Sequence, residues 1–237
     1  MTIQAIPTLN LALAFMPVFA VIILLYRWSL EANNAIYAVV RMLVQLLLVG
    51  YVLAAIFQAQ SAWVVMLVLL VMVVSASWIA LGSIKIHRMK LYRHALIGIV
   101  LGGGVTLVLV TQSVIALSPW FEPHYMIPLA GMIFANAMNS ISLATERLYA
   151  EIERGVAYEK ARSIAFQAAF IPVVNSLFAV GLVSLPGMMT GQILSGVSPI
   201  VAAHYQIVVM CMIFGSAGLS TAYFLAFAKP VFVQIEA

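Results

Sequence analysis

Charged residues are scarce in this chain, and one acidic residue type is missing. Of its 237 residues only 8% are charged, all seven acidic residues are Glu, and Asp does not occur. A soluble domain carries about 25% charged residues, so this chain cannot cover a water-facing surface with charge. The absence of Asp excludes Asp-based catalytic dyads, EF-hand loops and the Walker-B acid of nucleotide hydrolases.

Cysteine and the common catalytic motifs are also scarce. Cys211 is the single cysteine, so no intrachain disulfide can form and no zinc site can rest on cysteines alone. The sequence contains no G-x-x-x-x-G-K-[ST], H-E-x-x-H or G-x-S-x-G. Gly102–Gly104 lies inside an apolar run, which favours helix packing over phosphate binding. We expect no catalytic residue, no cofactor bound by this chain and no nucleic-acid partner.

Long apolar runs dominate what is present. Hydrophobic residues make up 65% of the chain, and the mean hydropathy is +1.14. A membrane-spanning helix needs about 20 mostly apolar residues. Seven runs approach or exceed that length: Leu9–Tyr26, Ile36–Phe57, Ala62–Leu81, Ala95–Leu117, Met126–Thr145, Phe166–Leu185 and Tyr205–Ala228. The sequence predicts an all-α, polytopic membrane protein with about seven transmembrane helices and one permease domain over residues 1–237.

The basic residues fix the expected orientation. All eleven fall in alternate connecting segments or at their edges: Arg27, Arg41, Lys85, Arg88, Lys90, Arg93, Arg147, Arg154, Lys160, Arg162 and Lys229. Because cytoplasmic loops carry the excess of Lys and Arg, this set predicts the cytoplasmic side. We therefore expect the N-terminus outside and the C-terminus inside.

The only extended polar stretch is residues 146–162. Its apolar positions recur at helical spacing, and Glu and Arg lie three apart on one helix surface, which predicts a cytoplasmic amphipathic segment that Gly155 interrupts. A solvated or interface-lying helix and a docking element for a cytoplasmic partner both fit this pattern. The candidate docking residues are Glu146, Arg147, Glu151, Arg154, Glu159 and Arg162.

The fifth run is unusually polar for a spanning helix. Asn136, Asn139 and Ser140 are spaced i, i+3 and i+4, which puts them on one helix face. Polar groups in hydrocarbon usually face protein or water. This face is either a packing seam joined by interhelical hydrogen bonds or the lining of a translocation path.

Residues 186–199 contain too many helix breakers for a continuous membrane helix. Irregular backbone at membrane depth is tolerated where it is buried or lines a cavity, so we predict a broken or re-entrant segment. Its candidate path or gate residues are Pro186, Gly187, Met188, Met189, Thr190, Gly191 and Gln192.

Metal-ligand candidates are few. Glu122 and His124 lie two apart on the predicted outer side, and His204 borders the breaker-rich segment. Interface anchoring explains the aromatic neighbours of the first pair well, and no spacing matches a closed metal site. These three residues are only weak candidates.

Several segments resemble the FetB-type permeases of ABC transporters. L-V-S-L-P-G-M-M-T-G-Q-I-L-S-G-V-S-P at Leu182–Pro199, followed by Tyr205-Gln206-Ile207, is similar to the signature of that family. Further similar segments are R-M-L-V-Q-L at Arg41–Leu46, G-Y-V-L at Gly50–Leu53, I-P-L-A-G-M-I at Ile127–Ile133, N-A-M-N at Asn136–Asn139 and I-P-V-V-N-S at Ile171–Ser176. Together they extend over nearly the whole chain.

The resemblance implies a membrane subunit that pairs with a separate ATPase and exports a substrate. Bacterial relatives are associated with iron export, and plant relatives with aluminium tolerance. ATP–Mg would then bind to the partner subunit. The family pattern also has a longer cytoplasmic stretch with an L-G-A-[ST] segment that engages the ATPase. Here Ser163-Ile164-Ala165-Phe166 follows residues 146–162 directly, and no such segment occurs.

We therefore expect a multi-pass permease of the inner (plasma) membrane. It would export iron or another metal with a cytoplasmic ABC ATPase, as a homodimer surrounded by lipid, because one seven-span subunit has no second half to complete a central path. The alternatives are a channel or secondary carrier that needs no ATPase, and a non-transporting scaffold. The absence of Asp or Glu deep inside any span disfavours a proton-coupled carrier.

Overall fold

The computed structural model describes residues 7–59, 61–82, 84 and 87–236. In that part of the chain, seven helices are long and apolar enough to cross a membrane: Asn10–Arg27, Ala32–Gln58, Ala62–Ala80, Arg88–Val114, Pro123–Glu153, Tyr158–Ala179 and Pro199–Phe227. The prediction of an all-α protein with seven candidate spans is confirmed. Lys85, one of the eleven basic residues, lies outside the described residues.

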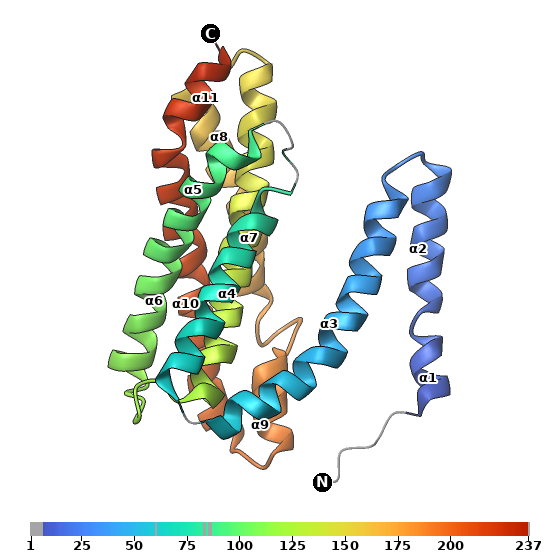
Figure 1. The fold of residues 1–237 in the computed structure, drawn as a ribbon, viewed down its shortest axis with the longest axis vertical. Helices are drawn as coiled ribbons and strands as arrows, with labels where there is room; N and C mark the ends of the chain where they lie inside the picture. Colours follow the sequence, from blue (N-terminus) through green and yellow to red (C-terminus); the bar gives the residue numbers. More distant parts are fainter. Residues whose placement is uncertain (1–6, 60, 83, 85–86, 237) are drawn as a thin grey trace. The chain divides into compact units, whose positions relative to one another are not determined.

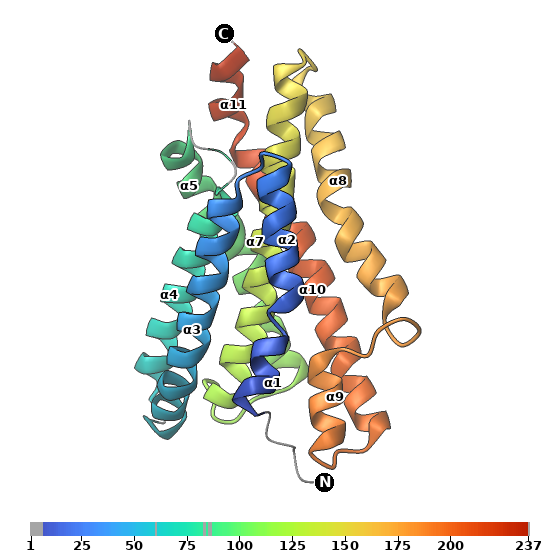
Figure 2. The same ribbon diagram turned by 90° about the vertical axis from the view of Figure 1, so that its right-hand side faces the viewer.

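The chain divides into two compact units, and the first, Met1–Ala59, is a helical hairpin. It contains α1 (Thr8–Leu13), α2 (Met16–Arg27) and α3 (Ala32–Ala59), and α2 packs against α3 (Figure 2). Pro17 lies in the first turn of α2, where its missing N–H removes no helix hydrogen bond. The short turn between α2 and α3 contains Ser29, whose φ is 54°. We call this unit the hairpin.

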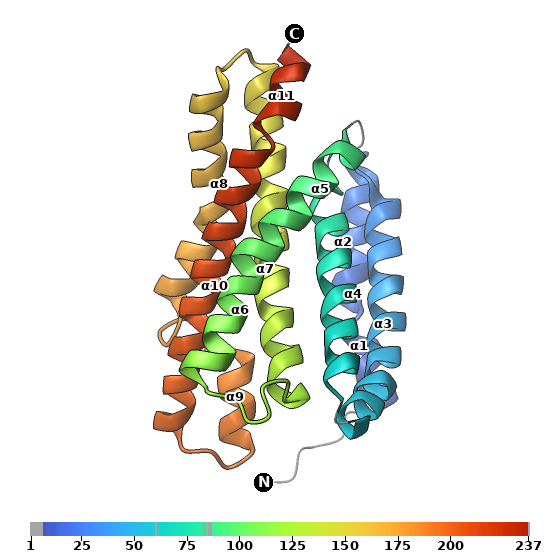
Figure 3. The ribbon, with the colours of Figure 1, turned by 60° about the vertical axis from the view of Figure 1, so that its left-hand side comes forward.

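The second unit, Gln60–Ala237, is a helical bundle. It consists of α4 (Ala62–Ala80), α5 (Arg88–Gly98), η1 (Ile99–Gly104), α6 (Val105–Val108), η2 (Leu109–Val114), α7 (Pro123–Glu153), α8 (Tyr158–Ala179), α9 (Gly187–Leu194), α10 (Pro199–Phe227) and α11 (Lys229–Glu236). The elements from α5 to η2 form one continuous rod in which π-helical turns alternate with α-helix (Figure 3).

The central helix of the bundle is α7, which packs against α4, η1, α8 and α10. Ile133, Ala137, Ile141, Ala144 and Leu148 follow one another at intervals of three or four residues, and all five are fully buried. This spacing puts them on one stripe of the helix. The alanines allow neighbouring helices to approach closely, which matters in a membrane because helices associate there by packing rather than by expulsion of water.

Two glycines bring the α5–η1 rod into direct contact with α10. A Cβ atom at Gly102 would lie 2.3 Å from the backbone nitrogen of Ser220, and one at Gly98 would lie 2.9 Å from its carbonyl oxygen. Neither position has room for a side chain, and the two glycines are four residues apart, as in the small-xxx-small packing motif. The interpretation of the glycine run as a packing element is confirmed for Gly102.

All eight described Lys and Arg residues of the bundle lie toward one end, which we call the basic end. It contains the start of α5, the α7–α8 turn, the first turns of α8 and the start of α11 (Figure 1). Its described cations are Arg88, Lys90, Arg93, Arg147, Arg154, Lys160, Arg162 and Lys229. Helix α9 and the connection 115–122 lie toward the opposite end. The 31 residues of α7 give a length of about 46 Å, which exceeds a hydrocarbon core of about 30 Å.

Candidate translocation pocket and basic end

A pocket of about 270 Å³ lies inside the bundle, where α7, α8, α9 and α10 meet the segment between α8 and α9. We call it the central pocket. Sulfur and polar side chains contribute much of its lining: Met132, Asn136, Ser176, Ser184, Met188, Gln206 and Met210. The other lining residues are Val180, Pro186, Gly187, Val209 and Ile213.

The central pocket is neutral and rich in acceptor atoms. Asn136 donates from Nδ2 to the Met132 carbonyl oxygen at 2.8 Å, and Ser176 donates from Oγ to the Val173 carbonyl oxygen at 2.7 Å. Each side chain uses one donor in a hydrogen bond to its own helix, and its oxygen keeps lone pairs that can accept another hydrogen bond. Gln206 is buried, and its Oε1 has no hydrogen-bond partner among the described residues. The pocket therefore offers amide, hydroxyl and thioether acceptors without a formal charge.

The breaker-rich segment folds as a turn followed by a short helix. Gly181 has a φ of 81°, and its N–H donates to the Ser184 carbonyl oxygen at 3.0 Å. Pro186 then caps α9, which ends before Gly196, whose φ is 93°. Only glycine adopts such positive φ values at little cost. This break brings Pro186, Gly187 and Met188 to the wall of the central pocket.

The structure brings four of the ten predicted path residues into the central pocket, namely Asn136, Pro186, Gly187 and Met188. Of the two other predicted residues on α7, Asn139 is exposed and Ser140 is buried. The remaining four are on α9: Met189, Thr190, Gly191 and Gln192. Thr190 donates to the Pro186 carbonyl oxygen at 3.1 Å, and Gln192 has a buried Oε1 without a partner among the described residues. The structure gives the positions of these residues, and their role in transport stays a prediction.

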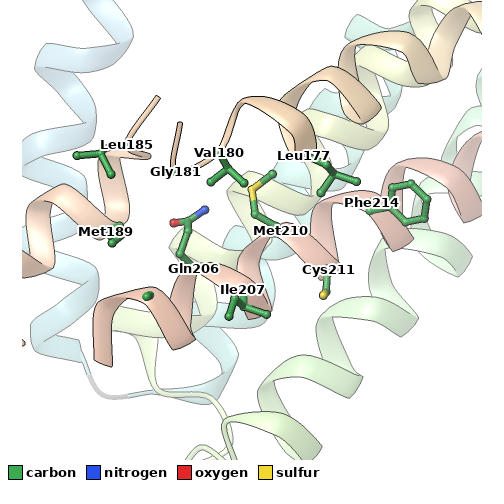
Figure 4. Close-up of a pocket in the computed structure, with 11 residues that line it drawn as sticks. Leu177, Val180, Gly181, Leu185, Met189, Gln206, Ile207, Met210, Cys211 and Phe214 are labelled. Carbon is green, nitrogen blue, oxygen red and sulfur yellow. The ribbon is translucent and has the colours of Figure 1, made fainter. Parts of the chain in front are cut away.

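A second, apolar pocket of about 400 Å³ adjoins the central pocket (Figure 4). The two share Val180, Gln206 and Met210. Figure 4 shows the Gln206 side chain directed from α10 toward Val180 and Gly181, with Met210 beside it. Met189 contributes to this apolar pocket rather than to the central one. Gln206 is therefore the polar group at the junction of the two pockets.

Sequence reasoning did not select Gln206, Met210 or Ser184 as site residues. A signal was present for Gln206, because a glutamine within an apolar spanning run usually faces protein or water. Met210 gave no such signal, since methionine is common in apolar helices. Only the turn at 180–186 decides that Ser184 reaches the pocket, because that turn folds back toward α10.

Ion pairs fix the α7–α8 turn at the basic end. Glu151 is buried and accepts from Arg147 at 2.7 Å and from Arg154 at 3.2 Å. The backbone N–H of Val156 also donates to the Glu151 carbonyl oxygen at 3.1 Å, and Gly155 has a φ of 76°. A carboxylate with two guanidinium partners restrains the conformation of the turn around it.

A second set of contacts joins α8 to α10 and α11. Glu159 accepts from Arg162 at 2.8 Å and from Lys229 at 2.6 Å, and the Tyr158 hydroxyl donates to the Leu225 carbonyl oxygen. Of the six predicted docking residues, Glu146, Arg147, Arg154 and Glu159 are exposed, Arg162 is half-buried and Glu151 is buried. Glu151 is therefore placed to hold the turn, whereas the four exposed residues are accessible to a partner.

The weak metal candidates do not form a cluster. His124 Nδ1 lies 2.8 Å from Glu122 Oε1 at the start of α7, and His204 is exposed on α10. Among the described residues, no group of three or more His, Cys, Asp or Glu side chains could hold a metal ion.

The segments described above match a known protein family. The model of an uncharacterised protein family, UPF0014, matches residues 7–232. That match includes both units and the central pocket.

The chain belongs to the UPF0014 family.

Curated relatives support this membership. The Probable iron export permease protein FetB of Escherichia coli is 35% identical over 93% of this chain and 90% of its own length. A UPF0014 membrane protein of Synechocystis is 38% identical over 76% of both chains. Protein ALUMINUM SENSITIVE 3 of Arabidopsis thaliana is 34% identical over 89% of this chain and 81% of its own length. No solved structure matches. The predicted resemblance to FetB-type permeases is confirmed, and the chain is a multi-pass membrane permease of this family.

Proposed function

We propose that the chain is the membrane subunit of an ABC exporter that moves iron or another metal out of the cytoplasm. It would act in the inner (plasma) membrane as a homodimer, with two copies of a cytoplasmic ATPase that binds ATP–Mg. The N-terminus would be outside and the basic end inside, as the positive-inside rule requires. The observation that carries the proposal is the central pocket, in which Asn136, Met188 and Gln206 meet at a helix break. Discontinuous helices form the substrate sites of many transporters.

The chemistry of the central pocket suits transient binding of a metal. Thioether sulfur favours soft ions, and amide and hydroxyl oxygens favour harder ones. A transport site must bind well enough for entry but weakly enough for release. Because none of the described residues that line the pocket is charged, a metal would be held by polar groups and sulfur rather than by opposite charges. Met132, Asn136, Met188 and Gln206 are the residues we expect to contact it.

The basic end supports coupling to a separate ATPase. Helix α7 extends from the α7–α8 turn to the central pocket, and the 18 residues from Asn136 to Glu153 correspond to about 25 Å of helix. Since Glu151 restrains the turn through Arg147 and Arg154, a force on the turn would move α7 as a rigid element. Helix α8 starts at the same turn and contributes Ser176 to the pocket. Closure of the ATPase dimer would thus displace two pocket walls together.

Reconstitution with the ATPase tests the proposal. The chain and a candidate ABC ATPase from the same organism should co-purify, and iron inside the donor compartment should stimulate ATP hydrolysis in liposomes. Asn136→Ala/Met188→Ala/Gln206→Ala should lower metal export about tenfold or more at unchanged protein level. The matched control is Asn175→Ala, since Asn175 is exposed on α8 outside the central pocket.

Other outcomes would select the alternatives. Export at an equal rate without the ATPase would indicate a channel or secondary carrier. Neither complex formation nor export would indicate a scaffold. Full export by the triple variant would show that the central pocket is not the path.

A further inference from the structure

A third pocket, of about 560 Å³, opens at the basic end between the first turns of α8 and the last turns of α10. We call it the interfacial pocket. Cationic side chains enter it from the start of α8, at Lys160 and Arg162. Ser163 and Gln167 add neutral polar groups, and the other lining residues are apolar: Ile164, Phe166, Ala222, Leu225 and Ala226. The pocket therefore combines a basic part and an apolar part, and neither belongs to the central pocket.

The local charge balance is positive. Glu159 is the acidic group at the start of α8, and it is shared between Arg162 and Lys229 at 2.8 Å and 2.6 Å. Within the described part of the chain, Lys160 forms no ion pair. Of the four described side chains Glu159, Lys160, Arg162 and Lys229, three are cationic and one is anionic, a net of two positive charges. An anion in this pocket would meet Lys160 without displacing the carboxylate of Glu159.

The pocket extends from cationic to apolar side chains along α8 and α10. Lys229 is the first residue of α11, just beyond the last turns of α10, and it pairs with Glu159, so this pair lies beyond the apolar side chains of Ala222, Leu225 and Ala226. From Lys160 to Gln167, α8 rises by about 10 Å. A headgroup layer is about 6 Å thick on each side of the hydrocarbon core. The basic part therefore lies at headgroup depth when the apolar part lies among acyl chains.

We propose that the interfacial pocket binds one anionic phospholipid. Its phosphate would contact Lys160 and Arg162, and one acyl chain would lie along Phe166, Ala222 and Ala226. Basic pockets between spanning helices on the cytoplasmic side are a known way of binding acidic headgroups. A free phosphate ion would gain nothing from the apolar wall, which favours a lipid as the occupant. The proposal does not depend on what the permease transports.

Native mass spectrometry of the full chain from mixed phosphatidylglycerol and phosphatidylcholine micelles tests this directly. The wild type should retain phosphatidylglycerol about tenfold over phosphatidylcholine, as expected for two cations near an acidic headgroup. Lys160→Gln/Arg162→Gln should lose that preference, and Glu159 would still keep Lys229 as a partner. The control Lys90→Gln/Arg93→Gln removes the same charge from exposed positions on α5, and it should retain the preference.

A second variant keeps the test informative if the charge variant misfolds. Ala222→Leu/Ala226→Leu fills the apolar part without changing charge and should also lose the lipid adduct. Displacement of the adduct by inorganic phosphate alone would indicate a free-anion site and overturn the proposal. Wild-type retention in both variants would overturn it too. Loss of ATPase binding in both variants with the lipid adduct intact would instead make this pocket a protein-docking surface.

Discussion

The hairpin and the bundle bury their residues very differently. No residue of the described span Asn10–Arg27 in the hairpin is buried, whereas half of the most apolar stretch of α7 in the bundle is buried. Both hairpin spans are nevertheless more apolar than α7. Helix α7 is less apolar because it carries small and polar residues where other helices contact it, such as Ala137, Ser140 and Thr145. The lower hydropathy of α7 therefore accompanies packing between helices through small and polar side chains.

The largest difference between the two units should appear on adding one methyl group. Gly102→Ala places a Cβ against the Ser220 backbone, and the α5–η1 rod would have to separate from α10. We expect little or no folded protein, because backbone atoms cannot give way as a flexible side chain can. In the hairpin, a Cβ at Gly50 meets nothing within 4 Å, and Gly50→Ala should be neutral or slightly stabilising. Fluorescence-detected gel filtration after heating measures both, and equal melting curves would contradict the comparison.

Removing leucine side chains should give a smaller contrast of the same sign. Leu148 is fully buried in α7, and Leu47 in α3 is 71% exposed. Leu148→Ala leaves a cavity and should lower the free energy of unfolding by about 2–5 kcal/mol. Leu47→Ala exchanges contacts with lipid, which is as apolar as leucine, and should change it by less than about 0.5 kcal/mol. Unfolding in denaturing detergent measures both variants. A cost at Leu47 similar to that at Leu148 would mean that another protein surface covers α3.

Removing one hydroxyl should give the smallest contrast. The Tyr158 hydroxyl donates to the Leu225 carbonyl oxygen and ties the start of α8 to α10. Tyr158→Phe should therefore cost about 1 kcal/mol, the typical net value of a hydrogen bond. Tyr51 in the hairpin is 81% exposed, so Tyr51→Phe should have no measurable effect. The same detergent unfolding assay compares them, and an unchanged Tyr158→Phe would show that packing alone holds this end of α8.

Four of the twelve residues that line the central pocket could be predicted from the sequence, and the others could not. The breaker-rich segment and the polar face of the fifth run were visible in the residue order, so Asn136, Pro186, Gly187 and Met188 were predicted together. Gln206 and Ser184 were not, because they join the site only where α10 and the 180–186 turn fold against α7. Glu151 was predicted as part of a docking surface, yet burial and two arginine partners make it a restraint on the α7–α8 turn. Local spacing shows which residues share a helix face, but not which neighbouring helix covers it.

The sequence by itself determined the class of protein. Scarce charge, absent Asp and seven apolar runs leave a multi-pass membrane protein, because a lipid environment demands long apolar helices regardless of how they pack. It also determined the family, through segments spread over nearly the whole chain. Only the tertiary structure decided that Gly102 touches the backbone of α10 and that Gln206 joins two pockets. Such contacts depend on the rotation and depth of one helix against another, and residues far apart in the chain set both.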